Sequence, residues 1–323
     1  MKAAVLHTFG EAPRYEDFPD PTPEKDEILV QVKAVALENI DKALAKGTHY
    51  ASHHFLPKLP AIVGSDGIAM RDDGQLVGFG GVRPPYGTMA EKAVFPDMYQ
   101  VPIPDGVDAA IAATVPASAL TSLFPLKWGA KLQPDETVLI NGATGFTGKL
   151  AIQVARLLGA KRVIGTGRNA VVLQSLHELG ADDVIDLKQS DENVIEAFKQ
   201  EAKISGNQVI LDFLWGHPTE LLIEALIPRE LSFAKNSVRL VQIGEMAGPK
   251  ISLAASALRT SGLEILGAGG GLTPEAIAEG TQQVWEWIKA GKLLAGIEQV
   301  PLKDVESSWQ RSDVSGKRIV IAP

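Results

Sequence analysis

The sequence predicts an α/β fold in two parts, a mostly β first part and a doubly wound parallel sheet after it. Residues 1 to about 110 contain short β-like runs separated by Pro and Gly. From about residue 115, short apolar strands alternate with helical stretches. This alternation is typical of a parallel sheet covered by helices on both faces. A chain of 323 residues is long for one compact core, so two domains are expected.

In the first part, residues 1–7, 28–35 and 91–95 have the composition of strands. Seven prolines mark turns between such runs: Pro19, Pro21, Pro23, Pro57, Pro60, Pro84 and Pro85. Long helical periods are absent from this half of the sequence, which favours a β-rich domain.

In the second part, strands are expected at 137–141, 162–166, 183–186, 209–212 and 239–244. Helices are expected at 148–158, 173–179 and 275–290, and a last strand at 318–321. In the first of these helices Lys149, Gln153 and Arg156 fall on one face and apolar residues cover the remainder, so this helix is expected to pack on the sheet.

Composition excludes several classes of function. The chain has no cysteine, which rules out disulfides, cysteine-ligated zinc, iron–sulfur clusters and a thiolate nucleophile. A formal charge of −8 with scattered basic residues argues against a nucleic-acid partner or an anionic membrane surface. The apolar run at the N-terminus is too short for a signal peptide, and no stretch reaches the roughly 20 apolar residues that span a bilayer. We therefore expect a cytoplasmic protein.

The strongest local motif is a glycine-rich turn between a strand and a helix, Gly142-Ala143-Thr144-Gly145-Phe146-Thr147-Gly148. Glycine allows a tight bend and lets the backbone approach a pyrophosphate, while the helix N-terminus offers N–H groups and partial positive charge. The first spacing is one residue longer than in G-x-G-x-x-G, and the Lys-Ser/Thr ending of a nucleoside-triphosphate loop is absent. The motif predicts dinucleotide binding; the alternative is a glycine-rich turn without a ligand.

The end of the next strand predicts which dinucleotide binds. NAD-binding domains usually carry an acidic residue there for the ribose 2′-hydroxyl. This chain has Thr166-Gly167-Arg168-Asn169 instead. A guanidinium suits a 2′-phosphate, whereas an acid repels it, so NADPH is favoured over NADH. The alternative is that Arg168 is a solvated loop residue.

Several ordered segments together resemble the medium-chain dehydrogenase/reductase superfamily, and within it the zinc-free quinone oxidoreductases. The segments are Met1–Leu6, Glu27–Asp41, Val63–Ala69, Tyr86–Val94, Leu120–Leu123 and Asn141–Gly148. The resemblance implies a Rossmann NADP-binding domain at 116–271. This domain would be inserted in a GroES-like substrate domain made of 1–115 and 272–323. It also implies a homodimer, formed through the edge strand Leu263–Gly267.

The zinc alcohol dehydrogenases of this superfamily differ from the chain at the positions that hold metal. They have Gly-His-Glu where this chain has Gly64-Ser65-Asp66, a cysteine near Asn39 and a lobe with four cysteines. No metal is therefore expected. Without a Lewis acid, an already activated acceptor such as a quinone or an α,β-unsaturated carbonyl fits better than a simple alcohol.

The resemblance also implies site residues. Asn39, Asp41, Thr48 and Tyr50 would lie near the substrate, with Tyr50 and Asn39 as catalytic residues and Tyr50 donating a hydrogen bond to a carbonyl oxygen. Alternatively, Tyr50 is a packed loop aromatic and Asn39 caps a turn. Thr121, Gly244, Gly267 and Gly269 would lie near the nicotinamide; for the last two, a flexible connection is the alternative. His49, His53 and His54 are expected on a solvated loop rather than around a metal.

These observations predict an NADPH-dependent oxidoreductase that transfers hydride to a quinone or an α,β-unsaturated carbonyl without zinc. Two alternatives stay open. One is a non-catalytic NADPH-binding protein, since the sequence has no decisive acid–base pair or metal site. The other is an enoyl-thioester reductase, which needs a groove for a long acyl carrier.

Overall fold

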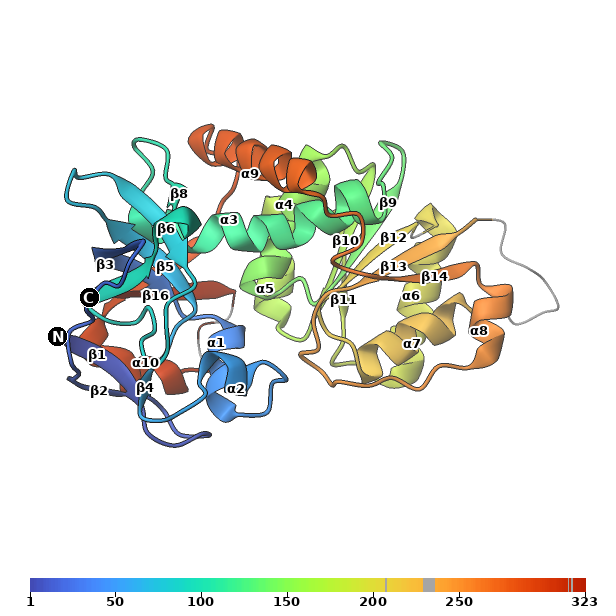
Figure 1. The fold of residues 1–323 in the computed structure, drawn as a ribbon. Coiled ribbons are helices and arrows are strands. Elements are labelled where there is room, and N and C mark those ends of the chain that lie inside the picture. Colours follow the sequence, from blue (N-terminus) through green and yellow to red (C-terminus); the bar gives the residue numbers. More distant parts are fainter. Residues whose placement is uncertain (207, 229–235, 313, 315) are drawn as a thin grey trace. The chain divides into compact units, whose positions relative to one another are not determined.

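The structure is a computed structural model that describes residues 1–323 apart from 207, 229–235, 313 and 315. The chain divides into two compact units. The first contains Met1–Pro116 and Gly296–Pro323, and the second contains Ala117–Ala295 (Figure 1). Both ends of the chain therefore belong to the first unit, and the second unit is an insertion in the sequence.

Strands are the main regular elements of the first unit. They are β1 (Lys2–Leu6), β2 (Arg14–Asp17), β3 (Glu27–Ala36), β4 (Ala61–Ile62), β5 (Asp66–Met70), β6 (Leu76–Gly80), β7 (Lys92–Pro96), β8 (Val101–Pro102), β15 (Gly296–Pro301) and β16 (Lys317–Ala322). Its short helices are α1 (Asn39–Lys46), α2 (Ser52–Phe55) and α10 (Val305–Gln310), with 3₁₀ turns η1 (Asp97–Tyr99) and η4 (Leu302–Asp304). One sheet has the order β2-β1-β4. The other has the order β15-β16-β3-β5-β6-β8, and β7 also pairs with β3.

The first unit has one main apolar core, and distant parts of the sequence contribute to it. Strand β16 pairs antiparallel with β3, which joins the C-terminal segment to the N-terminal sheet. Ile319 and Ile321 of β16 and Trp309 of α10 are buried with Val32 and Phe95 in the same cluster. The C-terminal segment is thus part of this core rather than an appendage.

The second unit is a parallel sheet with helices between its strands. Its strands are β9 (Thr137–Asn141), β10 (Arg162–Gly167), β11 (Asp183–Asp186), β12 (Val209–Asp212), β13 (Val238–Gln242) and β14 (Leu263–Gly267). Its helices are α4 (Phe146–Leu157), α5 (Ala170–Ser175), η3 (His177–Leu179), α6 (Asp191–Ser205), α7 (His217–Leu226), α8 (Ala255–Thr260) and α9 (Pro274–Lys289). Helix α3 (Ala109–Phe124) and the π-helical turn η2 (Pro125–Gly129) lead into this unit.

The strand order of this sheet is β11-β10-β9-β12-β13-β14, and every pair is parallel. The inner strands β9, β10, β12 and β13 bury residues on both faces of the sheet, since side chains alternate along a strand. In β9, Val138 and Ile140 join the core that contains α4 and α9, whereas Leu139 joins the core that contains α6, α7 and α8. The sheet is therefore doubly wound, and its order reverses between β9 and β12. In folds of this type, ligands bind at the carboxyl ends of the strands at that switch point.

Two sequence-based element predictions differ from the structure. The boundary expected at residue 272 lies at Ala295 instead, because α9 belongs to the second unit. The apolar face of α9, with Val284 and Trp287, is buried in the core under β9. The single helix expected at 173–179 is divided into α5 and η3.

Helix α3 and the turn after it form an apolar segment, Ala109–Gly129, of 21 residues. By length and composition alone this segment is able to cross a membrane, contrary to the sequence-based reading. More than half of its most apolar stretch is buried inside the protein, as in a core helix. Ala119, Leu123 and Leu126, for example, are fully buried in the core of the second unit.

Candidate active site

The predicted phosphate-binding turn lies between β9 and α4, at the switch point of the sheet. Gly142 has φ of +97°, a conformation that residues with a side chain rarely adopt. Gly145 is the N-cap of α4, and no side chain caps the first turn of this helix. The backbone and helix dipole at this end of α4 therefore form the kind of site that binds phosphate groups.

Glycine is also required at two positions where elements approach closely. A Cβ at Gly148 would lie 2.4 Å from the carbonyl oxygen of Gly142 and 2.6 Å from the Cα of Ala143. A Cβ at Gly167 would lie 2.2 Å from Cγ2 of Thr144. The turn is thus packed between its own helix and the end of β10, which fixes its shape.

A buried polar network holds the turn from below. The Gly142 N–H donates to Thr166 Oγ1 (3.1 Å), and this hydroxyl donates to Asn141 Oδ1 (2.8 Å). The Asn141 amide donates to Asp212 Oδ1 (3.0 Å). None of the side chains of Thr166, Asn141 and Asp212 is exposed. The network therefore links the carboxyl ends of β10, β9 and β12 through hydrogen bonds that solvent does not reach.

The Asp212 carboxylate has several donors besides Asn141. The hydroxyl of Thr219 donates to Oδ2 (2.6 Å), and the N–H groups of Leu214 and Trp215 donate to Oδ1 (3.0 and 3.1 Å). A buried carboxylate is tolerated only when such partners replace its water. Trp215 adopts φ of +52°, and its side chain packs partly buried against the core under α7.

The network changes the role of Thr166. The sequence assigned it to cofactor binding, but its side chain is fully buried, and its carbonyl accepts from the Ala143 N–H (2.8 Å). Thr166 is therefore a positioning residue for the turn and offers no group to a ligand. Gly167 is likewise held within the protein, because its carbonyl accepts from the Leu187 N–H (2.8 Å) and a side chain there would collide with Thr144.

The end of β10 presents Arg168 to solvent. No ion pair involves Arg168 within the described part of the chain, and the residue is exposed. Asn169 follows and caps α5, with its side chain accepting from the Val172 N–H (3.2 Å). The Arg168 guanidinium therefore lies in solvent directly after β10, and Asn169 fixes the start of the helix that follows, α5.

The remaining residues predicted near the nicotinamide fall into two groups. Gly244 is crowded, since a Cβ there would lie 2.6 Å from the Phe213 carbonyl oxygen. Gly267 and Gly269 have no protein atom within 4 Å of an added Cβ, so the protein leaves space beside them. Thr121 is exposed on α3, and its hydroxyl donates to the Ala117 carbonyl (2.8 Å).

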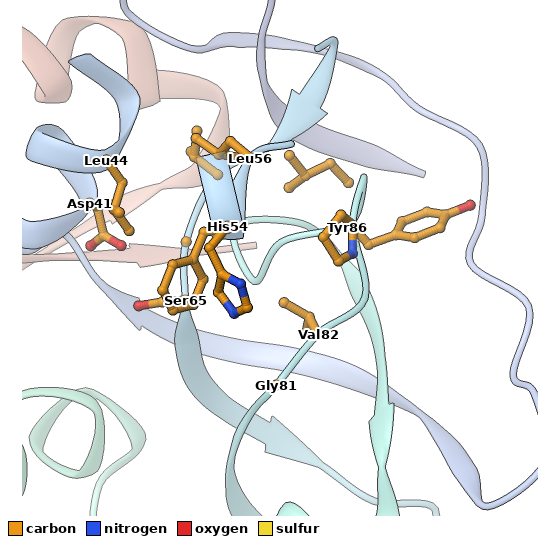
Figure 2. A pocket seen from close by; sticks show the side chains of 13 residues that line it. Asp41, Leu44, His54, Leu56, Ser65, Gly81, Val82 and Tyr86 are labelled. Carbon is orange, nitrogen blue, oxygen red and sulfur yellow. The ribbon is translucent and has the colours of Figure 1, made fainter. Parts of the chain in front are cut away.

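The first unit contains a cavity of about 240 Å³ (Figure 2). Its wall is mostly apolar. The lining residues are Asp41, Leu44, His54, Phe55, Leu56, Ile62, Val63, Gly64, Ser65, Gly81, Val82, Pro84 and Tyr86. The cavity thus combines helices α1 and α2 with the segment that precedes β5 and the loop that follows β6. A concave, apolar site with a few polar groups is the usual form of a small-molecule site.

Asp41 is buried in this wall, and only 4% of it is exposed. Its Oδ2 accepts from the Glu38 N–H (2.9 Å) in the capping box at the start of α1. Burial raises the pKa of Asp41 to about 8, and the Glu38 N–H, which favours the charged form, offsets only part of this effect. The carboxyl is therefore mostly protonated at neutral pH.

Comparison with known proteins agrees with this architecture. Residues 147–289 match the family model described as zinc-binding dehydrogenase. A trans-enoyl reductase of Aspergillus terreus is 28% identical over 85% of this chain and 79% of its own length. A quinone oxidoreductase of Pseudomonas aeruginosa is 28% identical over 73% of this chain and 70% of its own length. The Thermus thermophilus quinone oxidoreductase structure superposes with a TM-score of 0.77 at 25% identity, covering 100% of both chains.

Together these matches support a medium-chain dehydrogenase/reductase that is similar to quinone oxidoreductases, as the sequence motifs predicted. The matched family model covers the second unit from α4 to the end of α9, so it begins within the phosphate turn.

The first unit of this quinone oxidoreductase-like protein brings together only some of the residues predicted near the substrate. Asp41 lines the cavity, but Asn39, Thr48 and Tyr50 do not. Tyr50 is 96% exposed, and its ring lies against His49 with the ring centroids 4.3 Å apart. Asn39 is the first residue of α1. The catalytic roles of Asn39 and Tyr50 stay predictions, and the cavity itself gives them no support.

Sequence reasoning missed His54. It assigned the three histidines to a loop, whereas His53 and His54 lie on α2 and His54 reaches the cavity. The sequence contains one partial signal for this position: two apolar residues, Phe55 and Leu56, follow His54. In the structure both of them also line the cavity. Among the described residues, no group of three or more His, Cys, Asp or Glu side chains is arranged to hold a metal ion.

Proposed function

We propose that this chain is an NADPH-dependent reductase of quinones or α,β-unsaturated carbonyl compounds that works without zinc. The observation that carries the cofactor proposal is the pair of anion-binding features in the second unit. The N-terminus of α4, entered through Gly142 and Gly145, suits the pyrophosphate. The exposed Arg168 at the neighbouring strand end suits the 2′-phosphate.

The residues present fit NADPH sterically. An added Cβ at Gly145 would meet no protein atom closer than 3.8 Å, so the outer side of the turn is open to a ligand. When bound, NADPH supplies a hydride. The chain's part in the reaction is to fix the dinucleotide through the backbone of the turn and through Arg168. The quinone oxidoreductase of Thermus thermophilus, which forms a complex with NADPH, supports this assignment.

The zinc-free part of the proposal rests on the side chains that are available. The chain has no cysteine, and Ser65 stands where the zinc enzymes have histidine. Without a Lewis acid, the protein has to rely on an acceptor that is already electron-poor, as quinones and enones are. We expect the purified protein to contain no stoichiometric zinc and to keep its activity after dialysis against EDTA. Loss of activity that zinc alone restores would contradict this part.

The test of the proposed function is NADPH oxidation, followed by absorbance. The panel contains a quinone, a cyclic enone, an enoyl thioester and a simple aldehyde, with NADH as the control reductant. We expect turnover of the quinone or the enone with NADPH preferred. Turnover of the aldehyde alone, or equal use of NADH, would contradict the proposal.

A second candidate is reduction of an enoyl thioester, because one relative is a trans-enoyl reductase. Preferential turnover of the enoyl thioester in the same panel would establish it. A non-catalytic NADPH-binding role is the third possibility; tight NADPH binding without turnover of any acceptor would favour it.

We further propose a homodimer that forms through β14. This strand is at one edge of the parallel sheet, and Ile265 on it is 36% exposed. An apolar sheet edge needs to be covered, and pairing with the same strand of a second copy covers it. Sedimentation should give the mass of a dimer, and Ile265→Lys should shift it to the monomer. A monomeric wild-type protein would refute the proposal.

A further inference from the structure

The glycine turn at residues 267–271, at the carboxyl end of β14, has one closed face and one open face. On the closed face, an added Cβ at Gly271 would lie 3.0 Å from the Trp128 carbonyl oxygen and 3.6 Å from Trp128 Cβ. On the open face, an added Cβ at Gly267 or Gly269 would meet no atom of the described residues within 4 Å. Trp128 therefore supports the turn from behind, and the other side has room for a ligand.

The glycine turn has almost no side chains of its own to fix its shape. Its sequence is Gly-Ala-Gly-Gly-Gly. The Ala268 N–H donates to the Gln242 carbonyl at the end of β13 (3.1 Å), and the Gly270 N–H donates to the Gly267 carbonyl (3.1 Å). Gly271 has φ of +78°, a conformation that suits glycine. The shape of the turn thus depends on these backbone bonds and on the contact with Trp128.

Trp128 lies in the π-helical turn η2, which continues α3. Pro125 has no N–H, so the α-helical bond to the Thr121 carbonyl is missing. The Ala130 N–H donates instead to the Pro125 carbonyl, five residues earlier (2.6 Å). Single π-helical turns are rare and are frequent at functional sites. The irregular turn is therefore a reason to ask what Trp128 does.

A lysine holds η2 on helix α9. Lys127 Nζ donates to Glu279 Oε1 (2.7 Å) and to Gln283 Oε1 (3.0 Å), both on α9. The same ammonium lies over the Trp128 ring, 4.7 Å from its centroid, which is a cation–π geometry. Lys127 thus fixes the indole and the helix beneath it together.

The helix approaches the indole closely at Gly280. An added Cβ at Gly280 would lie 2.6 Å from Cε1 of Phe124 and 3.4 Å from Cη2 of Trp128. The two rings have their centroids 5.7 Å apart. The indole is therefore packed between Phe124, Lys127 and α9, and its backbone, against which Gly271 rests, has little freedom to move.

The strand order places the glycine turn on the side of the sheet opposite to Arg168. A dinucleotide lies across the point where the strand order reverses, here between β9 and β12. With the pyrophosphate at the N-terminus of α4 and the 2′-phosphate at Arg168 after β10, the adenosine half belongs on the β10 side. The nicotinamide half then extends toward the carboxyl ends of β12, β13 and β14, where the open face of the glycine turn lies.

We propose that Trp128 is a positioning residue for the nicotinamide half of the cofactor. The indole, packed on α9, fixes the backbone of η2, and this backbone fixes the glycine turn whose open face borders the nicotinamide. Trp128 acts through the turn and need not touch the cofactor. The inference rests on the proposed function, because it requires the dinucleotide to bind as described above.

The test compares two ligands that share the adenosine half. NADPH has the nicotinamide half, whereas adenosine 2′,5′-bisphosphate ends before it. In Trp128→Leu we expect the Kd for NADPH to rise about tenfold, because a turn that has to be ordered on binding weakens affinity. The Kd for adenosine 2′,5′-bisphosphate should stay within about twofold of wild type. Trp128→Phe keeps a ring against Gly280 and should restore NADPH binding to within about threefold. Isothermal titration measures all three proteins.

The fluorescence of bound NADPH gives a second readout, which a loss of stability alone would not change. Reduced nicotinamide emits more strongly when its ring leaves water and is held in one orientation. At saturating NADPH, the folded Trp128→Leu protein should therefore show weaker emission per bound NADPH than wild type. Equal emission from the two saturated proteins contradicts a role of Trp128 in holding the nicotinamide half.

Two further variants separate the turn from general destabilisation. Trp285→Leu is the matched control, because Trp285 is also a partly buried tryptophan, lies on α9 and is outside the core cluster that contains Trp128. It should bind both ligands as wild type does. Gly271→Ala leaves the indole in place but sets a Cβ against the Trp128 carbonyl, so it should show the same selective loss of NADPH affinity. If circular dichroism shows Trp128→Leu to be unfolded, Gly271→Ala decides.

The inference and the proposed function fail in different ways. Equal weakening of both ligands in Trp128→Leu overturns the inference, as does unchanged NADPH affinity in Trp128→Leu or in folded Gly271→Ala. In these cases NADPH still binds and is oxidised by the wild type, so the proposed function stands. A wild type that binds neither ligand refutes the proposed cofactor, and the inference with it.

Discussion

The hydroxyl of Thr166 is the single group whose removal tests how the phosphate turn is held. Thr166→Val keeps the shape of the side chain and deletes one donor and one acceptor. The Gly142 N–H then loses its partner at 3.1 Å, and Asn141 Oδ1 loses its donor at 2.8 Å. Asn141 is fully buried and Gly142 is partly buried, so water has little access to replace the lost bonds.

The magnitude follows from these two unpaired groups. A buried polar group without a partner costs about 1–3 kcal/mol, so the variant should lose roughly 2–4 kcal/mol of unfolding free energy. For domains of this size, about 2–4 °C of melting temperature corresponds to 1 kcal/mol, which gives a decrease of about 5–15 °C. With its N–H released, Gly142 no longer holds the turn in one shape. We expect the Kd for NADPH to rise about tenfold, equal to about 1.4 kcal/mol.

The assay is isothermal titration of NADPH into the variant, together with a calorimetric melt. Ser261→Ala is the control, because Ser261 also makes two buried hydrogen bonds: its hydroxyl donates to the Ala257 carbonyl and accepts from the Leu263 N–H. These bonds lie at the amino end of β14, away from the turn. The control should melt earlier but bind NADPH normally. If Thr166→Val also binds NADPH normally, the network does not position the turn and the reasoning is refuted.

Three further outcomes are expected. Arg168→Ala should raise the Kd for NADPH about tenfold and leave that for NADH unchanged, since a charged hydrogen bond to the 2′-phosphate contributes about 1.5–3 kcal/mol; equal effects on both dinucleotides would contradict this. Gly148→Ala should force α4 away from β9, because its Cβ would lie 2.4 Å from the Gly142 carbonyl, and circular dichroism should show a lower melting temperature. Asp41→Asn should stabilise the protein increasingly as the pH rises. The folded pKa of about 8 exceeds the ordinary aspartate pKa of 3.8, so the wild type loses stability between about pH 4 and 8. Melts at pH 5 and pH 8 that differ equally for the two proteins would contradict this assignment.

Local chemistry made the second unit readable from sequence. The strand at 137–141 is followed by glycines whose spacing only a strand-to-helix turn explains, and the structure has φ of +97° at Gly142. Apolar strands that bury both faces need no information about their partners to be recognised. The sequence did not predict that the helix expected at 173–179 divides into α5 and η3. It also did not predict that α9 belongs to the second unit. The apolar face of α9 requires a cover, but the sequence does not say which unit provides it.

The buried network was beyond sequence reasoning for a different reason. Asn141 and Asp212 are 71 residues apart, and they become neighbours because β9 and β12 pair in a register that sets Asn141 opposite Asp212. Thr166 joins them from β10, on the other side of β9. Without knowledge of which strand pairs with β12, the sequence shows Asp212 only as a polar residue at the end of a strand. Its function as the partner of Asn141 appears only once the strand order is known.

The same reasoning explains why the histidines were misjudged. His53 and His54 are adjacent in sequence and similar in their surroundings, yet His53 packs edge-on against Phe9 and His54 lines the cavity. The difference comes from α2, a single helical turn that sends neighbouring side chains in different directions. Gly64 and Val82, which line the same cavity, come from segments ten or more residues away. Whether a polar residue lines a cavity therefore depends on which distant segments the fold brings next to it. A sequence motif such as Asn39–Tyr50 does not contain this information.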